Sequence, residues 1–285
     1  MRLLYIVLSA LLASCVTSKL NVEKGTFQTI KPPNIYGNNR YLTNNFNYII
    51  SYDANIGKNK TMSLPEIINE HNDFPHTSAN IHYRLIENTL GFQFYCAMKN
   101  KYDMYLGFGS GIQNFPYSLL IFGYNGKSIE IGGAAYWGLT IDKASYEGMW
   151  FYESFWTASD WASHDEYIKL KDMRILHSYG GLTVYTSFYW EKFALNYSAS
   201  ISNPWLIKKL PVLHDENIYD ADISFEFPFL LMQDIGISYT PNKIKYRLGV
   251  NQITSIKFPE QYWEPGQYWG IGQYWGLSVQ MAYGW

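Results

Sequence analysis

The sequence predicts an all-β protein, a closed antiparallel transmembrane barrel of about ten strands and at most twelve, with short periplasmic turns and longer outer loops. Three observations support this. Aromatic residues make up 18% of the 285 residues and charged residues only 16%, against ~25% charged in soluble domains. Segments of about ten residues alternate apolar and polar side chains. No apolar run after residue 20 is long enough for a membrane helix. Composition alone fits a tyrosine-rich soluble β-sandwich equally well.

The N-terminal residues 1–15 are typical of an export signal. Arg2 is followed by a short apolar stretch and then by small residues, the pattern of a cleaved signal peptide. The stretch Leu12-Ala13-Ser14-Cys15 also matches a bacterial lipobox, in which Cys15 is lipidated; ordinary cleavage nearby, with Cys15 incidental, is the alternative. Cys96 is the only later cysteine, so the mature chain can form neither an intrachain disulfide nor a cysteine zinc cluster.

Residues 16–40 are interpreted as an N-terminal extension and residues 41–285 as the barrel. Polar stretches at 57–79, 203–217 and 255–270 are expected to be loops, and the other connections are short. Alternating long and short connections are expected where strands cross a membrane. No linker separates a second domain.

The predicted strands have one apolar and one polar face. Phe92 and Phe94 alternate with Gln93 and Tyr95 before a tight turn that begins at Asn100. The same alternation recurs at 129–139, 182–201, 223–239 and 244–251. A set of charged residues on the polar faces is expected to pair inside the barrel: Lys245, Arg247, Glu226 and Asp234. Ten strands leave a narrow lumen filled largely by side chains, so a wide diffusion pore is not expected.

The last strand carries the clearest local pattern. Leu277, Val279, Met281, Tyr283 and Trp285 alternate with small or polar residues, and the sequence ends on the aromatic residue. This resembles the C-terminal signal that the assembly machinery of bacterial outer-membrane barrels reads. Apolar faces that point outward need a lipid solvent, and the sheet must close to satisfy its backbone groups there. We therefore expect a location in the bacterial outer membrane, in contact with membrane lipids.

Several short segments occur in an order that resembles one family. They are 129–137, Gly148-Met149, Trp156, Ser163-His164-Asp165, 179–183, Trp205 with His214 nine residues later, Thr240-Pro241-Asn242 and 270–285. Together they resemble the omptins, ten-stranded outer-membrane endoproteases. The resemblance implies a peptide substrate and contact with outer-leaflet glycolipid.

In omptins an Asp pair and an Asp-His pair activate a water molecule, which requires a base that accepts its proton. By position, Glu153 replaces the first Asp and Phe155 the second. Val212 replaces the Asp of the Asp-His pair, and His214 remains. Because valine cannot orient an imidazole, the resemblance implies a degenerate active site.

Two repeated tripeptides add candidate residues. They are His164-Asp165-Glu166 and His214-Asp215-Glu216, which could form acid/base pairs or a weak metal site if they meet at one rim, or could be solvated loop residues. Asp160 enters if the alignment with the family motif is shifted by a few residues. No cofactor motif is present, and a net charge of -2 gives no reason to expect nucleic acid.

Three functions remain open. The first is an omptin-like surface endopeptidase, and the second is a non-enzymatic barrel acting as an adhesin, structural protein or small channel. The third is a soluble β-protein anchored by a lipid on Cys15, which predicts that aromatic faces turn inward around a core. The direction of the apolar faces separates the third from the others.

Overall fold

The computed structural model describes residues 17–37, 46–56, 60–63, 67–68, 78–86, 89–113, 115–157, 160–203, 209–223, 229–256 and 273–284. Within these ranges the chain forms sixteen strands, and no helix there could cross a membrane. The predicted signal peptide with Cys15, Glu226 and Trp285 lie outside the described residues.

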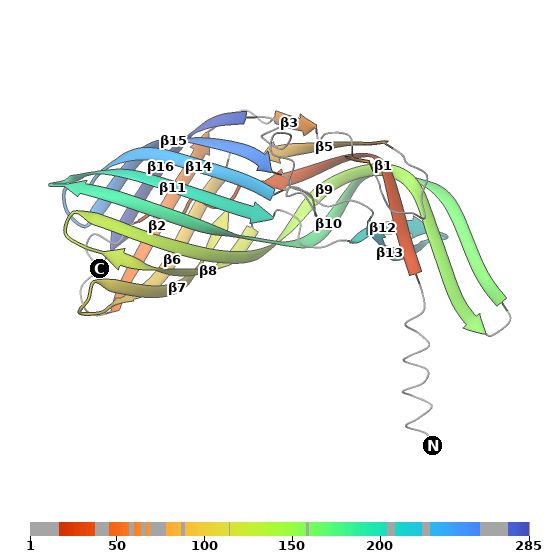
Figure 1. Cartoon of the computed structure of the whole chain (residues 1–285), viewed down its shortest axis with the longest axis horizontal. Helices are drawn as coiled ribbons and strands as arrows, with labels where there is room; N and C mark the ends of the chain where they lie inside the picture. The colour runs from red at the N-terminus through yellow and green to blue at the C-terminus, as the bar shows by residue number, and fades with distance from the viewer. Residues whose placement is uncertain are drawn as a thin grey trace, which may run out of the picture.

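Ten strands form a closed barrel (Figure 1). They are β2 (Phe46–Ile56), β6 (Thr89–Lys99), β7 (Met104–Gln113), β8 (Phe115–Asn125), β9 (Ile129–Thr157), β10 (Asp160–Trp190), β11 (Phe193–Asn203), β14 (Phe229–Tyr239), β15 (Ile244–Ile256) and β16 (Gln273–Gly284). Each strand pairs antiparallel with the next along this order, and β16 closes the barrel on β2. The predicted closed ten-stranded barrel is confirmed.

The barrel wall has an apolar outer face and a polar inner face. On β15, Leu248 is 61% exposed while the neighbouring Arg247 is 2% exposed, because adjacent residues of a strand point to opposite faces. The same alternation on β6 leaves Phe92 and Phe94 outside and Gln93 inside. A soluble protein would place these groups the other way round. The distribution fits a barrel in lipid. It is the opposite of what a soluble, lipid-anchored β-protein would show.

The two ends of the barrel differ in their connections. At one end, which we call the turn end, short connections at 100–103, 126–128, 191–192 and 240–243 join the strands. The predicted turn at Asn100 is confirmed, since its Oδ1 accepts hydrogen bonds from the backbone N–H groups of Tyr102 and Met104. The opposite, loop end has long connections at 57–88, 204–228 and 257–272, although β7 and β8 are joined there by residue 114 alone.

At the loop end, β9 and β10 continue far beyond the barrel, and there the sheet gains further strands, which together with these extensions we call the platform (Figure 1). β1 (Thr17–Ile30) lies antiparallel to this part of β9 and parallel to β5 (Ser78–Ile86). β13 (Asn217–Ile223) also pairs with β1 and forms a hairpin with β12 (Lys209–His214), while β3 (Lys60–Ser63) and β4 (Ile67–Ile68) pair with β5. Stretches 57–79 and 203–217 thus contain short strands where loops were predicted, because other strands offer them partners. The buried core of the platform includes Leu20, Phe27, Trp150 and Val212, and it continues into the loop end of the barrel through Leu230, Met232 and Ile253.

Residues 31–37, which we call the lumen segment, connect the platform to the barrel from the inside. All seven residues are buried and none belongs to a strand. Lys31 contacts Gln113 at the loop end of β7, and Gly37 contacts Lys245 near the turn end of β15. The chain therefore passes through the lumen from the loop end towards the turn end, where β2 begins.

Candidate functional site

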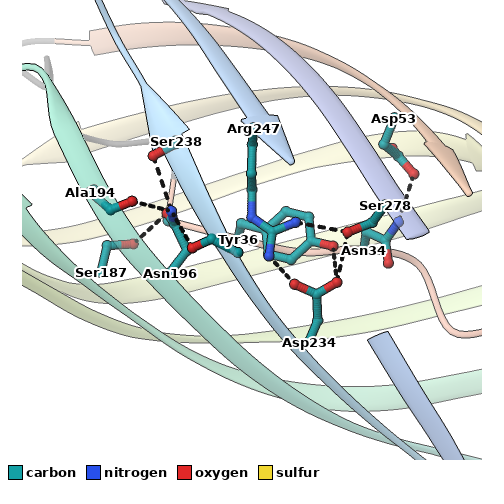
Figure 2. A network of polar contacts seen from close by, with 12 residues as sticks. Asn34, Tyr36, Asp53, Ser187, Ala194, Asn196, Asp234, Ser238, Arg247 and Ser278 are labelled. Carbon is teal, nitrogen blue, oxygen red and sulfur yellow. Dashed lines mark hydrogen bonds and ion pairs between the residues drawn. The ribbon is translucent and has the colours of Figure 1, made fainter. Parts of the chain in front are cut away.

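The lumen segment is bound to the barrel wall first through its backbone carbonyls. Gln113 Nε2 donates to the carbonyl oxygen of Lys31 at 3.1 Å, and Gln93 Nε2 donates to that of Asn34 at 2.7 Å. Asn34 Nδ2 in turn donates to Asp53 Oδ2 at 3.2 Å (Figure 2). Strands β2, β6 and β7 thus each hold the segment through an inward polar side chain.

The centre of the lumen is occupied by Tyr36 (Figure 2). Its hydroxyl donates to Asp234 Oδ2 at 3.0 Å, and the guanidinium of Arg247 lies 3.7 Å from the ring centroid, within range of a cation–π interaction. Arg247 and Asp234 form a fully buried ion pair, and Ser278 Oγ bridges them with contacts of 2.9 and 2.8 Å. The predicted pairing of Arg247 and Asp234 inside the barrel is confirmed.

Near the turn end, Lys245 holds the end of the segment. Its ammonium donates to the carbonyl oxygen of Gly37 and to Asn196 Oδ1, the latter at 3.1 Å. A Cβ at Gly37 would lie 2.6 Å from Cδ of Glu130. Only glycine therefore fits at this position without a shift of the wall.

The other half of the lumen is filled by tyrosine rings. Tyr105, Tyr117, Tyr136, Tyr179 and Tyr185 form one buried cluster with Ile35 of the lumen segment. Several buried polar atoms of the wall have neither accessible surface nor a hydrogen-bond partner among the described residues, including Asp53 Oδ1, Gln113 Oε1 and the Tyr117 hydroxyl. The wall and segment thus leave these atoms no contact with water.

On the platform, the structure brings His214 and Asp215 together with Glu166. His214 Nδ1 lies 2.6 Å from Glu166 Oε2, and its Nε2 lies 3.3 Å from Asp215 Oδ2. Asp215 sits at the tight β12–β13 turn with a left-handed backbone, φ 45°. The ring also packs on Trp150, with centroids 5.2 Å apart. Because an ionised carboxylate only accepts hydrogen bonds, Nδ1 is the nitrogen that donates to Glu166, and Nε2 faces Asp215.

The other predicted site residues are not placed beside this cluster by any described contact. Asp165 is exposed on β10. Glu153 lies on β9 opposite Ser163, and Asp160 and His164 lie on β10; the side chains of these three are outside the described residues. Glu166 and His214 belong to the two copies of the repeated tripeptide, so the repeat in the sequence pointed to the two segments that meet here. The lumen segment carries no such motif.

A basic surface lies where β9 and β10 leave the barrel. Ile141 and Leu176 are an outward apolar pair, and two residues further Lys143 and Arg174 form an outward basic pair. Beyond them, Lys24 and Lys169 contact the carboxylate of Glu147 at 3.0 and 2.5 Å. Hydrogen bonds from Lys169 and Lys24 lower the pKa of Glu147. No group of three or more His, Cys, Asp and Glu residues in the described ranges is placed to hold a metal ion.

No protein-family model and no curated protein matches the chain. Among solved structures, a mutant of TodX, a monoaromatic hydrocarbon channel of P. putida, aligns over 86% of this chain and 91% of its own, with 8% identity and a TM-score of 0.34. CymD, another such channel, aligns over 85% and 88%, with 7% identity and a TM-score of 0.34. A FadL homologue of Pseudomonas aeruginosa aligns over 84% and 89%, with 7% identity and a TM-score of 0.31. Likeness at this level assigns no function, and the omptin relationship stays a prediction.

Proposed function

We propose that the chain is a non-enzymatic outer-membrane barrel of the small-channel type, held closed by its own lumen segment. The observation that carries the proposal is the burial of all seven residues of this segment inside the barrel. The segment is held by side chains from β2, β6, β7, β14 and β15 and by no strand pairing. A piece of chain bound in this way can shift within the lumen without breaking the barrel sheet, although it stays attached to β1 at the loop end and leads to β2 at the turn end.

The membrane position follows from the outer surface. The apolar belt faces lipid, the turn end faces the periplasm and the loop end faces outward, as is usual for bacterial barrels. In this orientation Lys143 and Arg174 lie just beyond the apolar belt on the outer side. Their charge suits the anionic groups of outer-leaflet glycolipid. The C-terminal strand β16 would be the part that the barrel-assembly machinery reads.

Electrical recording of the refolded chain in a planar bilayer tests the channel proposal. We expect the native chain to be silent and an Asn34→Ala/Tyr36→Ala variant to conduct, because both substitutions remove contacts between the segment and the wall. Heat-modifiable gel mobility checks that each protein has folded as a barrel. Steady conductance of the native chain, or a folded variant that stays silent, would refute the proposal.

A surface endopeptidase is the second candidate, favoured by the contacts of His214 with Glu166 and Asp215. Cleavage of a mixed peptide library by the folded chain, lost in His214→Ala, would support it. Because Val212, which is buried, stands where the resemblance places the aspartate that orients the imidazole, we expect no cleavage by either protein.

A further inference from the structure

Strand β1 lies at the loop end of the barrel, whereas β2 begins and β16 ends at the turn end. The barrel has ten strands, an even number, so its first and last strands start and finish at the same end. This is the turn end, because the backbone N–H of Gly284 donates to the carbonyl oxygen of Lys243 in the connection 240–243. β1 pairs with β9 and β5 at the opposite end (Figure 1). The lumen segment therefore makes one further crossing, in addition to those of the ten strands.

The length of the lumen segment suits a crossing of the membrane. Its seven residues span at most about 25 Å when fully extended, which is about the height of the apolar band of membrane barrels. The segment cannot cross in the lipid beside the barrel, because its backbone groups would find no hydrogen-bond partners there. Inside the barrel, Lys31 is held towards the loop end and Gly37 towards the turn end. The lumen is thus the route that satisfies these groups.

The wall binds the backbone of the segment as well as its side chains. Three wall side chains donate to backbone carbonyl oxygens spaced three residues apart: Gln113 to Lys31, Gln93 to Asn34 and Lys245 to Gly37. Every residue of a polypeptide has a carbonyl oxygen, so these donors suit an extended chain whatever its side chains. Pro32 and Pro33 have no backbone N–H and need no acceptor from the wall. The chemistry of the lumen therefore fits a polypeptide as its occupant.

The parallel pairing of β1 with β5 follows the same path. Residues 24–30 of β1 pair in register with residues 80–86 of β5. Parallel neighbours require the chain to return to the same end before the second strand begins. Here the return consists of the lumen segment and β2, one crossing in each direction. β5 therefore covers β1 on the side to which the chain has come back.

Resting on the membrane orientation proposed above and not on conductance, we infer that the barrel carries its own N-terminal strand through its lumen and displays β1 on the outer surface of the cell. The lumen is the passage for this polypeptide, and the segment that remains in it closes the barrel. The platform retains the displayed strand through its ladders with β9, β5 and β13.

The test is the labelling of single cysteines on intact cells with a membrane-impermeant maleimide, in a Cys96→Ala background. Lys19→Cys and, separately, Lys24→Cys place the thiol at exposed positions of β1. Lys171→Cys, at the exposed irregularity of β10, is the control for the outer side, and Lys127→Cys, exposed in the turn-end connection 126–128, is the control for the periplasmic side. The chain without an added cysteine measures the background, and heat-modifiable gel mobility shows that each barrel has folded.

We expect both β1 positions to react on intact cells as Lys171→Cys does, and Lys127→Cys to react only after the outer membrane is permeabilised. β1 positions that react only after permeabilisation, beside a reactive Lys171→Cys, would overturn the inference. Reaction of Lys127→Cys but not of Lys171→Cys on intact cells would show a reversed barrel and overturn both the orientation and the inference. Two positions on β1 keep the test decisive if one variant fails to fold. No outcome depends on whether the barrel conducts, so failure of the channel proposal is seen separately in the bilayer recordings.

Discussion

Replacement of Tyr36 by phenylalanine isolates one contact of the closed state. The change removes the hydroxyl that donates to Asp234 at 3.0 Å and keeps the ring under the Arg247 guanidinium. A hydrogen bond to a charged group contributes about 2 kcal/mol, and Asp234 keeps Arg247 and Ser278 as partners. A loss of about 1.4 kcal/mol corresponds to a tenfold change in an equilibrium constant. Tyr36→Phe should therefore raise the open-to-closed ratio by roughly ten- to thirtyfold.

A second substitution at the same position orders the series. Tyr36→Leu also loses the cation–π contact, which adds about 1 to 2 kcal/mol in a desolvated site, so its open probability should exceed that of Tyr36→Phe. Single-channel recording measures these probabilities, and Tyr102→Phe is the control because Tyr102 is exposed on a turn. If folded Tyr36→Leu opens no more often than the native chain, Tyr36 does not hold the segment and the reasoning is wrong.

Three further outcomes are expected. Thr26→Cys and Ser145→Cys, at paired positions of β1 and β9, should form a disulfide. In a variant whose lumen segment is also weakened, the barrel should be silent while the disulfide is intact and should conduct after reduction; in the otherwise native chain it should be silent in both states. Gly109→Ala should abolish the heat-modifiable folded band, since its Cβ would strike the neighbouring backbone, whereas the outward Ser110→Ala should fold. Because folding lowers the pKa of Glu147, its contribution should be complete above its unfolded value of about 4.3 and be lost as the pH falls through the lower folded value. The protection of β1 amides, after correction for the pH dependence of intrinsic exchange, should fall in that acid range, and unchanged protection there would contradict this assignment.

The barrel was predictable because its information is local. Alternation of period two specifies which side chains share a face, so Arg247 and Leu248 could be assigned to opposite sides before any strand was paired. The tight turn at Asn100 and the closing strand β16 follow from the same short-range rules. Pairing of Arg247 with Asp234 was predictable from their shared face and the narrow lumen.

The lumen segment and β1 were not predictable in the same way. The contacts of Tyr36 join residues 198 positions apart, and no periodic pattern marks residues 31–37. β1 has some strand alternation, but its partners β9, β5 and β13 are set by the long hairpin of the platform. The contact between His214 and Glu166 likewise depends on how the β12–β13 hairpin lies across β10.

The closed state is therefore held from two places. Closure buries Asp53 Oδ1 and Gln113 Oε1 with no hydrogen-bond partner among the described residues. Each such group costs about 1 to 3 kcal/mol, which offsets part of the stabilisation from the hydrogen bonds that the segment makes. The strand that precedes the segment is paired with β9 over Thr17–Phe27 and with β5 up to Ile30. Because β1 runs directly into Lys31 and β2 begins at the opposite end, the segment can move along the lumen only if these ladders shift. We therefore expect the platform to control the lumen. A substitution that weakens the pairing of β1 should open the barrel even when no residue of the lumen segment is changed.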